Sequence, residues 1–563
     1  MYCGWLPRVA RFVGLTVLGL ALGVLSLTAA PARAADDEAG FTSLFDGKTL
    51  SGWDGDPDHW RVEDGLITGE NTLEKPLKTN SFLIWRQGEV DDFELCCDYR
   101  FQSEWGNSGI QYRSFEDPQK MGKWVVGGYQ ADCETGVTHS GGLYGERFRG
   151  IIGGRGQKVV IGTDHKPKLV ERFADAAKLQ EIVKANDWNS YRIVARGFHL
   201  TLELNGHLTS DVMDEDLAVR RRGGIIALQL HAGKHPMKVQ FRNIRLKRLK
   251  MEGVKKIVFV AGHVSHGYAQ HEHIAGCRLL AGLINANVPQ AFATAYCNGL
   301  AREPLAPQPA ETVKRDGWPQ DPTAFDNADA VVIYSDGGAG HPMMAHLDQV
   351  AALVKRGVGL GCIHYAVEIP KGQPGDSLKD WIGGYFETFW SVNPHWHAVF
   401  SQFPEHPTAR GLKPFEIDDE WYFHMLFRDG MQGVTPILTA IPPDAARAGK
   451  DNAHGGNPTV RAEKGRPEHL GWVCQRADGG RGFGFTGGHF HWNWAQDNFR
   501  TFVLNAIVWI AGLDVPEGGV PSKAPTLAEL KAGVDKPEPP PSKSYDPAKV
   551  QQLIDSFQAQ RAK

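Results

Sequence analysis

Two different patterns of hydrophobic and polar residues divide the chain. Between residues 41 and 249, short segments alternate apolar and polar residues and are separated by Gly, Asp and Asn, which predicts antiparallel β-strands. Only residues 175–185 have a convincing helical pattern in this part, and Asn205-Gly206 predicts a tight hairpin turn. Many short strands separated by turns are typical of a β-sandwich.

From residue 255 onward, continuous apolar runs replace the alternation. Such runs suit buried parallel strands, and amphipathic segments between them predict helices, so the sequence predicts a doubly wound α/β domain. The strands are expected at 255–262, 328–336 and 358–366, and the helices at 272–283, 342–355 and from 498 onward. Residues 515–563 form a tail rich in Pro, Lys and Glu, which predicts an extended linker followed by a short helix at 548–560.

Three segments of the predicted sandwich carry polar residues two positions apart, where a half-buried strand would place apolar ones. One face carries Gly109, Gln111 and Arg113, a second carries Gln130, Asp132 and Glu134, and a third carries Gln229 and His231. One interpretation is a solvated outer face of the sandwich. The other is a polar floor that binds a hydroxyl-rich ligand, with Asn107 at the entry and aromatic side chains for sugar rings: Trp105, Tyr112, Tyr129 and Tyr144.

The same segments carry a family resemblance. FTSLFDGKTLSGW, WRVEDGLITGE, DFELCCDYRF, NSGIQYR, GGYQADCE and GGIIALQLHAG occur in order between residues 41 and 249. In these motifs the chain resembles the 3-keto-disaccharide hydrolase family. The resemblance implies a concanavalin-like jelly roll that acts on glycosides already oxidised at C3.

A C3 ketone acidifies the proton on C2 and places the C1 aglycone β to the resulting carbanion. Cleavage by proton abstraction and elimination needs a base, a stabiliser for the enediolate and an acid for the leaving oxygen. We predict His231 or Asp132 as the base, and Arg113 with Gln111 and Gln130 around the oxyanion. Glu134 and Tyr144 are the candidate acids, and the predicted substrate-binding residues are Asn107, Gln111, Gln130, Gln229 and Trp105.

Two alternatives remain open for this predicted site. His231 and Asp132 could share a divalent metal that polarises the ketone, or His231 could be a core histidine satisfied by a backbone partner. The glycine-rich residues 141–157 are interpreted as a loop over the site rather than a phosphate cradle, because no helical pattern follows them. No nucleotide cofactor is therefore expected.

Histidines gather after the predicted strands of the α/β part, where ligands bind in open α/β sheets. His263 and His266 follow the first strand, His364 follows another, and His489 lies near the end of the domain. We predict that these four residues hold a divalent metal whose identity the sequence does not specify, accompanied by Glu368, Asp419 and Glu420. The alternatives are a sugar site and ordinary histidines of surface loops.

This second part also resembles a known family. VAGHVSHGYAQHEHIAGC, YSDGGAGHP, RGVGLGCIHYAVE, WSVNPHWHAVF and GRGFGFTGGHFHWNW, within residues 254–514, resemble the ThuA-like (trehalose utilisation) family, which is related to class I glutamine amidotransferases. An amidotransferase needs a thiolate at a sharp strand-to-helix elbow. Here His364 stands two positions after Cys362 and can occupy the elbow itself. We therefore interpret Cys362 as an ordinary buried cysteine.

The N-terminus predicts export. Arg8 and Arg11 precede an apolar run from 12 to 28 and a small-residue site, so residues 1–34 are expected to be a signal peptide cleaved before Ala35, and no stable membrane span is expected afterwards. An uncleaved anchor is the alternative. Three arginines and no acidic residue precede Ala35, so cleavage changes the net charge from −4 to −7, which argues against a nucleic-acid partner. The seven cysteines that remain have no disulfide-like spacing.

Together these patterns predict a secreted or periplasmic enzyme with a jelly roll at 41–249 and a ThuA-like α/β domain at 254–514. The jelly roll would cleave 3-keto-glycosides, and the α/β domain would act on or bind a related keto sugar. The alternative is a non-catalytic glycan-binding sandwich that targets a catalytic α/β domain. Oligomeric state does not follow from the sequence.

Overall fold

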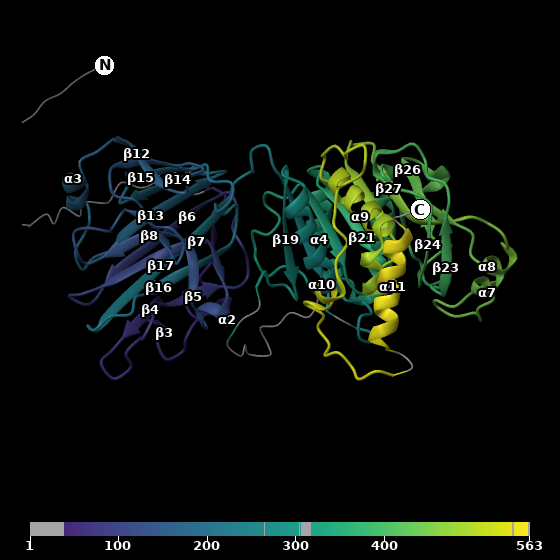
Figure 1. Ribbon diagram of the computed structural model, residues 1–563, viewed down its shortest axis with the longest axis horizontal. Coiled ribbons are helices and arrows are strands. Elements are labelled where there is room, and N and C mark those ends of the chain that lie inside the picture. The colour runs from purple at the N-terminus through teal and green to yellow at the C-terminus, as the bar shows by residue number, and fades with distance from the viewer. Residues whose placement is uncertain (1–38, 264, 303–304, 306–316, 543–544, 561–563) are drawn as a thin grey trace, which may run out of the picture. The chain divides into compact units, whose positions relative to one another are not determined.

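The structure is a computed structural model that describes residues 39–560, except 264, 303–304, 306–316 and 543–544 (Figure 1). The predicted signal peptide lies outside the described residues. Within them, no helix is both long enough and apolar enough to cross a membrane.

The first domain is the predicted jelly roll, built from two large sheets. The first sheet has the order β12-β11-β15-β14-β13-β6-β17-β4-β3, with β1 beside β17; the second has the order β10-β9-β8-β7-β16-β5-β2. Neighbouring strands are antiparallel, apart from β11 and β15. The strands of the first sheet are β1 (Thr42–Ser43), β3 (Trp60–Glu63), β4 (Leu66–Asn71), β6 (Phe93–Phe101), β11 (Gln157–Ile161), β12 (Pro167–Arg172), β13 (Asn189–Arg196), β14 (His199–Leu204), β15 (His207–Asp214) and β17 (Met237–Arg248).

The second sheet of the jelly roll carries the three polar segments. Its strands are β2 (Trp53–Asp54), β5 (Ser81–Trp85), β7 (Asn107–Glu116), β8 (Val126–Glu134), β9 (Leu143–Glu146), β10 (Gly150–Gly153) and β16 (Ile225–Leu230). β7 pairs with β8 on one side and with β16 on the other, so the three segments are neighbours.

The core of the jelly roll follows the alternation in the sequence. In β14, Leu200, Leu202 and Leu204 are buried, whereas the residues between them are partly exposed. β14 and β15 form the predicted hairpin, and the turn residues Asn205 and Gly206 have φ values of 50° and 81°. Both values lie in the left-handed region that this two-residue turn requires.

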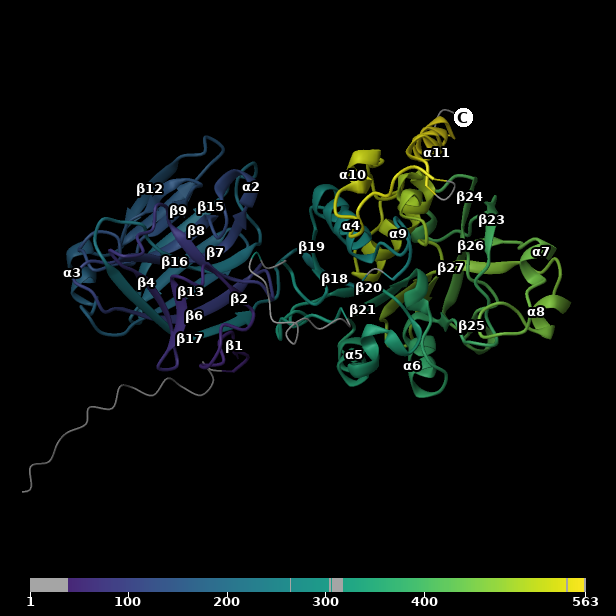
Figure 2. The same cartoon turned by 90° about the horizontal axis from the view of Figure 1, so that it is seen from below.

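The second domain is a seven-stranded sheet with helices on both faces. The order is β19-β18-β20-β21-β28-β27-β26, and the first five strands are parallel. Figure 2 shows α4 and α9 on one face of the sheet and α5 and α6 on the other. The strands are β18 (Lys255–Ala261), β19 (Ala291–Cys297), β20 (Ala330–Tyr334), β21 (Gly359–Ile363), β26 (Val434–Ala440), β27 (Glu468–Gln475) and β28 (Arg481–Phe485).

Most of the long helices lie close to the predicted positions; the exception is residues 373–382, for which no helix was predicted. α4 (His273–Asn287), α5 (Leu347–Lys355), α6 (Gln373–Ile382), α9 (Asp497–Ile510) and α11 (Pro547–Gln560) are the long helices. In the jelly roll, α3 (Ala176–Glu181) is shorter than predicted, although Asp175 caps its N-terminus by accepting a hydrogen bond from Ala177 N. The short elements are α2 (Pro118–Met121), α7 (Asp444–Arg447), α8 (Pro458–Ala462), α10 (Leu527–Lys531), β22 (Gly384–Tyr385), β23 (His395–Phe400), β24 (Phe415–Glu420) and β25 (Leu426–Phe427), with 3-10 turns η2 (Gly338–Gly340), η3 (Pro342–Ala345), η4 (His364–Val367), η5 (Pro407–Ala409), η6 (Asp429–Met431) and η7 (His491–Ala495).

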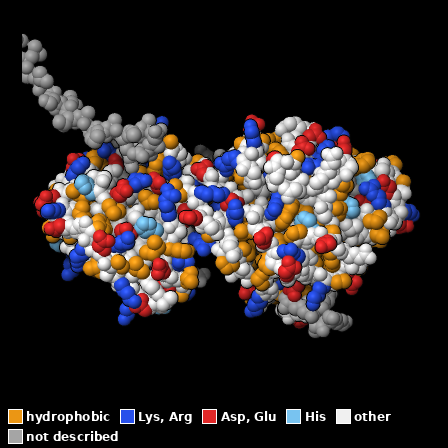
Figure 3. Space-filling view, turned by 90° about the horizontal axis from the view of Figure 1, so that it is seen from above, with side chains coloured by type: hydrophobic (Ala, Val, Ile, Leu, Met, Phe, Trp, Pro, Cys, Tyr) orange, Lys and Arg blue, Asp and Glu red, His pale blue; other side chains and the backbone are white. Residues whose placement is uncertain are grey.

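The cysteines are buried, and the charges on one face of the surface are of mixed sign. The seven cysteines from Cys96 to Cys474 are buried, and no disulfide joins them among the described residues. On the face shown in Figure 3, lysine and arginine side chains are interspersed with aspartate and glutamate. That face presents no continuous area of one sign.

The C-terminal segment is more than a linker. Leu530 in α10, Tyr545, and Ile554 and Phe557 in α11 are buried in the same apolar cluster as α4 and α9. The segment also forms hydrogen bonds with earlier parts of the α/β domain. His491 Nε2 donates to Leu530 O at 3.0 Å, and Asp535 N donates to Glu272 Oε2 at 3.3 Å. The tail therefore belongs to the α/β domain.

We expect Ile554→Ala to release α11 from this cluster. Ile554 is 1% exposed, and removing a buried aliphatic side chain of this size costs about 2–5 kcal/mol. Hydrogen exchange of the α11 amides should accelerate, whereas Gln552→Ala, on the exposed side of the same helix, should leave it unchanged. Equal protection in both variants would show that α11 is not held by this contact.

Candidate functional site

A cavity of about 290 Å³ lies on the second sheet of the jelly roll, over the three polar segments. β7, β8, β9 and β16 each contribute side chains to it, together with the ends of neighbouring loops. Its lining consists of Asn80, Asn107, Gln130, Asp132, His139, Tyr144, Glu146, Ile151, Gln229 and His231. The structure therefore brings together six of the predicted site residues: Asn107, Gln130, Asp132, Tyr144, Gln229 and His231.

The register of β7 and β8 explains why these groups meet. Gly109 lies opposite Asp132, and Gln111 lies opposite Gln130. A Cβ atom on Gly109 would stand 2.4 Å from the Gln130 side chain, so only glycine leaves room for that amide to lie across the strand.

A chain of hydrogen bonds orients the Asp132 carboxylate. Ser114 Oγ donates to Gln111 Oε1, Gln111 Nε2 donates to Gln130 Oε1, and Gln130 Nε2 donates to Asp132 Oδ1, each at 2.6 Å. Gln111, in the middle of this series of hydrogen bonds, is fully buried and does not line the cavity. Its prediction as a substrate-binding residue is therefore wrong. Its role is to fix the orientation of Gln130.

Two polar atoms at the cavity have no hydrogen-bond partner among the described residues. They are His231 Nδ1 and Gln229 Oε1, both buried from solvent. Buried polar groups are nearly always satisfied, so two unsatisfied atoms beside one cavity indicate a place for a polar ligand. The finding argues against the alternative of a core histidine bonded to the backbone.

The carboxyl groups at the cavity are electrostatically perturbed. Burial, reinforced by Glu134 and Glu146, raises the pKa of Asp132 to about 7. Burial also raises the pKa of Glu146 and of Tyr144. A carboxyl group with a pKa close to neutral pH can both accept and return a proton.

This pKa shift predicts a pH-dependent cost in stability. The pKa of Asp132 is higher in the folded protein than in the unfolded chain, so protonation of Asp132 favours the folded state. Its contribution to the free energy of unfolding is fully present below about pH 4 and is lost as the pH rises through about 7. Asp132→Asn should therefore stabilise the protein at pH 8 by on the order of 1–3 kcal/mol, and by less at pH 5. Thermal unfolding at both pH values measures this; an equal shift at both would contradict it.

Arg113 does not lie in the cavity, which corrects its predicted role at the oxyanion. The β7–β8 register shifts between Tyr112 and Phe115, and Arg113 itself has a φ of 45°. This bulge breaks the alternation and turns the guanidinium toward Asp92, whose carboxylate it meets at 2.8 Å. Arg113 also donates to Asp91 O and Gly197 O. Its role is structural.

We expect Arg113→Ala to destabilise the jelly roll strongly. The substitution leaves the buried Asp92 carboxylate and two carbonyl groups without their donor, which costs about 3–5 kcal/mol. Arg192→Ala, which removes a half-buried ion pair with Glu94, is the control and should cost about 1 kcal/mol or less. Chemical denaturation compares them; similar losses would contradict the structural role.

Glu134 and Trp105 also lie elsewhere than predicted. Glu134 accepts hydrogen bonds from Thr138 N and His139 N and lines a different cavity, so it holds a turn instead of facing Asp132 across the site. Trp105 does not line the cavity but packs edge-on against His231, with ring centroids 6.1 Å apart. It supports the position of that imidazole.

The sequence interpretation missed Glu146. Its Oε1 accepts from Asn80 at 3.3 Å and its Oε2 accepts from Gln229 at 3.3 Å. Alternation could have identified it, because Glu146 is two positions after Tyr144 in β9. The glycine-rich context concealed the strand.

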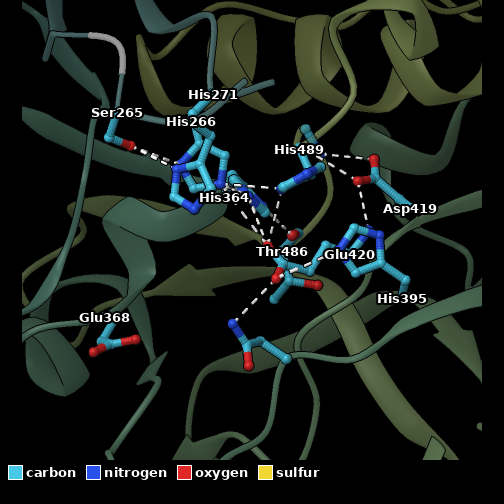
Figure 4. Close-up of polar contacts among 12 residues, drawn as sticks. Ser265, His266, His271, His364, Glu368, His395, Asp419, Glu420, Thr486 and His489 are labelled. Atoms are coloured by element: carbon cyan, nitrogen blue, oxygen red, sulfur yellow. Dashed lines mark hydrogen bonds and ion pairs between the residues drawn. The ribbon is translucent and has the colours of Figure 1, made fainter. Parts of the chain in front are cut away.

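A second site lies in the α/β domain, where one carboxylate and three imidazoles converge (Figure 4). His364 follows β21, His489 follows β28, His271 precedes α4, and Glu420 ends β24. The first two are therefore at the carboxyl ends of parallel strands, where open α/β sheets bind ligands. All three histidines are almost fully buried.

The spacing of the four ligand atoms suits a tetrahedral metal ion. His271 Nε2 lies 3.0 Å from His364 Nε2 and 3.1 Å from His489 Nδ1. Glu420 Oε2 lies 3.0 Å from His489 Nδ1 and 3.4 Å from His364 Nε2. Metal–ligand bonds of about 2.0 Å place tetrahedral ligands about 3.3 Å apart.

The ring tautomers strengthen this interpretation. His364 Nδ1 lies 2.8 Å from Thr486 O, which can only accept, so Nδ1 carries the hydrogen and Nε2 of the neutral ring presents its lone pair. His271 Nδ1 faces the Asp336 carboxylate at 3.3 Å, which likewise leaves its Nε2 lone pair toward the cluster. Two lone pairs 3.0 Å apart require a cation between them, either a metal ion or a proton.

The groups around the cluster hold it in place. Asp419 is fully buried and accepts hydrogen bonds from Gly488 N, His489 N and Glu420 N. Burial would raise the pKa of Glu420, but the three neighbouring imidazoles hold it well below the usual range. The residues can therefore present a charged carboxylate with three imidazoles, the donor set of many zinc sites.

Two of the four predicted metal ligands belong to this cluster, His364 and His489. His263 is exposed and its carbonyl accepts from His273 Nδ1, so it is not a ligand here. The His266 ring lies 3.6 Å from that of His271 at a tilt of 31°, and His266 forms a second group with His271 and Asp336. His271 was not among the four predicted ligands, whereas Glu420, expected to accompany the metal, is one of the converging side chains. The segment 263–273 contains several histidines, and the sequence alone does not select His271 among them as a ligand.

His364 occupies the strand-to-helix elbow, as the sequence suggested. It follows β21 directly, begins η4 and has a φ of 56°, which is uncommon for a residue other than glycine. Cys362 is fully buried within β21, and burial raises the pKa of its thiol well above its ordinary value. Thiol chemistry at Cys362 is therefore disfavoured.

Comparison with known families supports both resemblances. Residues 40–247 match the family described as the 3-keto-alpha-glucoside-1,2-lyase-like domain, and residues 310–510 match the family described as trehalose utilisation. The fold of the second domain extends N-terminal to that match, because β18 and β19 belong to the same sheet. No curated protein matches the chain.

Solved structures similar to the jelly roll include proteins of several kinds. A putative glycosyl hydrolase from Parabacteroides distasonis is 19% identical, with 39% of this chain and 98% of that chain covered and a TM-score of 0.26. The carbohydrate-binding module CBM66 from Bacillus subtilis is 14% identical (35% and 96% covered, TM-score 0.24). A β-glucanase from Bacillus licheniformis is 10% identical (37% and 97% covered, TM-score 0.23).

Proposed function

The chain joins a 3-keto-alpha-glucoside-1,2-lyase-like domain to a trehalose-utilisation domain, and from this premise we propose that it cleaves 3-keto-glycosides. The jelly roll is the cleaving domain. The α/β domain acts on or binds a related keto sugar. The pattern of residues 8–34 supports export of the protein as part of the same proposal.

The observation that carries the proposal is the pairing of Asp132 with unsatisfied polar atoms at one cavity. Asp132 has a pKa near 7, and His231 Nδ1 and Gln229 Oε1 lack partners among the described residues. A hydroxyl-rich ring with a carbonyl group offers both donors and acceptors to such a site.

In the proposed reaction, Asp132 or His231 removes the proton from C2 of the sugar. The electron pair of the C2–H bond forms the C1=C2 double bond, and the C1–O bond breaks with its electron pair moving to the aglycone oxygen. That oxygen takes a proton from Tyr144 or Glu146, which both line the cavity. Addition of water to the unsaturated product completes a net hydrolysis.

The amide groups of Asn107 and Gln130 would bind hydroxyl or carbonyl oxygens of the ring. No group of three or more metal-ligating side chains is found at this cavity among the described residues. The reaction as proposed uses only the side chains of the chain itself.

In the α/β domain, His271, His364, His489 and Glu420 would hold a divalent metal ion. Such an ion, when bound, acts as a Lewis acid toward a carbonyl or hydroxyl oxygen. The residues around it fix the ligand tautomers, as Asp336 and Thr486 O do here.

Product analysis in D₂O tests the cleavage. With 3-keto-trehalose, we expect consumption, while trehalose itself should remain intact. The released keto glucose should carry deuterium at C2, because the proposed route breaks that C–H bond. A reaction without enzyme gives the background exchange.

Three results would contradict the proposal in different ways. Cleavage of unoxidised trehalose would indicate an ordinary glycosidase, and keto glucose without deuterium would exclude elimination. Binding of the sugar without any consumption would favour the glycan-binding alternative.

A further inference from the structure

A second pair of polar side chains lies in the α/β domain outside the four-ligand cluster. His454 Nε2 lies 3.1 Å and 3.2 Å from the two carboxylate oxygens of Glu368. The Glu368 side chain is 3% exposed, whereas that of His454 is 37% exposed. A buried carboxylate that holds a solvent-accessible imidazole is the arrangement that orients a catalytic base.

The geometry fixes which nitrogen of His454 is available. Nε2 points at the carboxylate and donates its hydrogen, so Nδ1 of the neutral ring carries the lone pair. Among the described residues, none forms a hydrogen bond with Nδ1. The hydrogen bond to Glu368 also raises the pKa of His454, which makes the ring a stronger base.

The pair is connected to the cluster by Asn393. Asn393 N donates to His454 O at 3.1 Å, and Asn393 Nδ2 donates to Glu420 Oε1 at 3.2 Å. One residue therefore contacts both the loop that carries His454 and the carboxylate of the cluster. Figure 4 shows Glu368 in the same close-up, without a contact to the cluster.

Aromatic side chains lie between the pair and the cluster. Phe386 stacks on His454 with centroids 5.5 Å apart, Tyr422 contacts Phe386 at 5.3 Å, and His364 contacts Tyr422 at 4.9 Å. Glu368 follows β21 on the same segment as His364, which places both groups at the carboxyl edge of the sheet.

An exposed aromatic residue is bonded through its backbone to the loop that carries His454. Phe389 is 69% exposed and has a φ of 65°, a strained conformation for a bulky residue. Two hydrogen bonds hold it there, from Phe389 N to Ala453 O and from Asn457 Nδ2 to Phe389 O. The backbone of this exposed aromatic residue is therefore tied to Ala453, the neighbour of His454 in the chain, and an exposed ring is suited to the apolar face of a sugar.

We propose that His454, oriented by Glu368, is the proton-transferring base of a second active site in the α/β domain, which acts on a hydroxy ketone bound beside the cluster. This inference rests on the proposed function for its substrate class. His454 Nδ1 removes a proton from the carbon next to the carbonyl. The C–H electron pair forms a C=C bond, and the carbonyl π pair moves to its oxygen, which gives an enediolate.

Return of the proton regenerates a ketone or an aldehyde. Delivery to the same carbon from the other side inverts its configuration, and delivery to the neighbouring carbon moves the carbonyl group. Both outcomes balance without an oxidant, a reductant or another reactant. The reaction class is therefore an isomerisation or epimerisation of a keto sugar.

The test uses the full chain with the jelly-roll site disabled by Asp132→Asn and His231→Asn, loaded with Zn²⁺ or Mn²⁺. The probe is 3-keto-glucose, which has no aglycone to eliminate, and the readout is deuterium uptake from D₂O by NMR. We expect uptake above the rate without enzyme, and a fall of about 100-fold after adding His454→Gln or Glu368→Gln. Asp376→Asn, an exposed carboxylate of α6, is the control.

Metal content and sugar affinity separate catalysis from folding. Both variants should keep the metal content of the background protein and its affinity for 3-keto-glucose within about threefold, measured by mass spectrometry and calorimetry. Uptake that is unchanged by either substitution, or absent from the background protein, would overturn the inference. Cleavage of 3-keto-trehalose by the unmodified protein tests the jelly-roll proposal independently.

Discussion

Asp132→Asn is expected to lower kcat for a 3-keto-disaccharide by about 10²–10⁴-fold, because it removes the candidate base without changing the shape of the site. Asn can still accept the hydrogen bond from Gln130 Nε2, so the chain from Ser114 to residue 132 should persist. In the unmodified protein, kcat/KM should fall as the pH drops below about 7, since protonation of Asp132 removes the base.

Asp98→Asn is a suitable control for this experiment. Asp98 lies in β6 of the other sheet, where its carboxylate accepts hydrogen bonds from Arg242 and Asn243. Its activity should stay within about twofold of the unmodified protein. If Asp132→Asn also retained that activity, His231 would remain the candidate base and Asp132 would be assigned to ligand binding.

His364→Asn is expected to abolish stoichiometric metal binding, from about one ion per chain to less than about 0.1. Asn tolerates a positive φ, so the elbow conformation at this position should survive while the Nε2 ligand is lost. The remaining three side chains leave the coordination incomplete. Metal analysis after dialysis against Zn²⁺ or Mn²⁺ measures the change.

His397→Asn provides the comparison, because His397 is a half-exposed histidine beside Asp418 in the same domain but outside the cluster. Its metal content should equal that of the unmodified protein. If the unmodified protein bound neither ion, the close approach of His271 and His364 would have to be explained by a shared proton, and the metal proposal would fail.

Local patterns determined the elements because they depend on short-range physics. Alternation identified the sandwich strands, and continuous apolar runs identified the parallel strands, since burial on one or two faces follows from the period of the chain. The hairpin at Asn205-Gly206 followed from the conformational freedom of those two residues.

The candidate jelly-roll site could be predicted only as far as strict alternation held. Asp132, Gln130 and His231 lie where the period of two places them. Arg113 does not, because it lies within the β-bulge between Tyr112 and Phe115 and a buried carboxylate lies on the other side. A bulge depends on the partner strand, which the sequence of β7 alone does not contain.

The α/β site shows the same limit in another form. The sequence indicated that histidines gather at the ends of strands, but it could not select which four ligand atoms meet. His271, His364, Glu420 and His489 are separated by up to 218 positions, and only the sheet order and the loops held by Asp419 bring them within bonding distance. The chain itself thus determined its two folds and the types of chemistry available, through periodicity and composition. Tertiary structure decided which side chains act together, because register, bulges and strand order are set by contacts between distant segments.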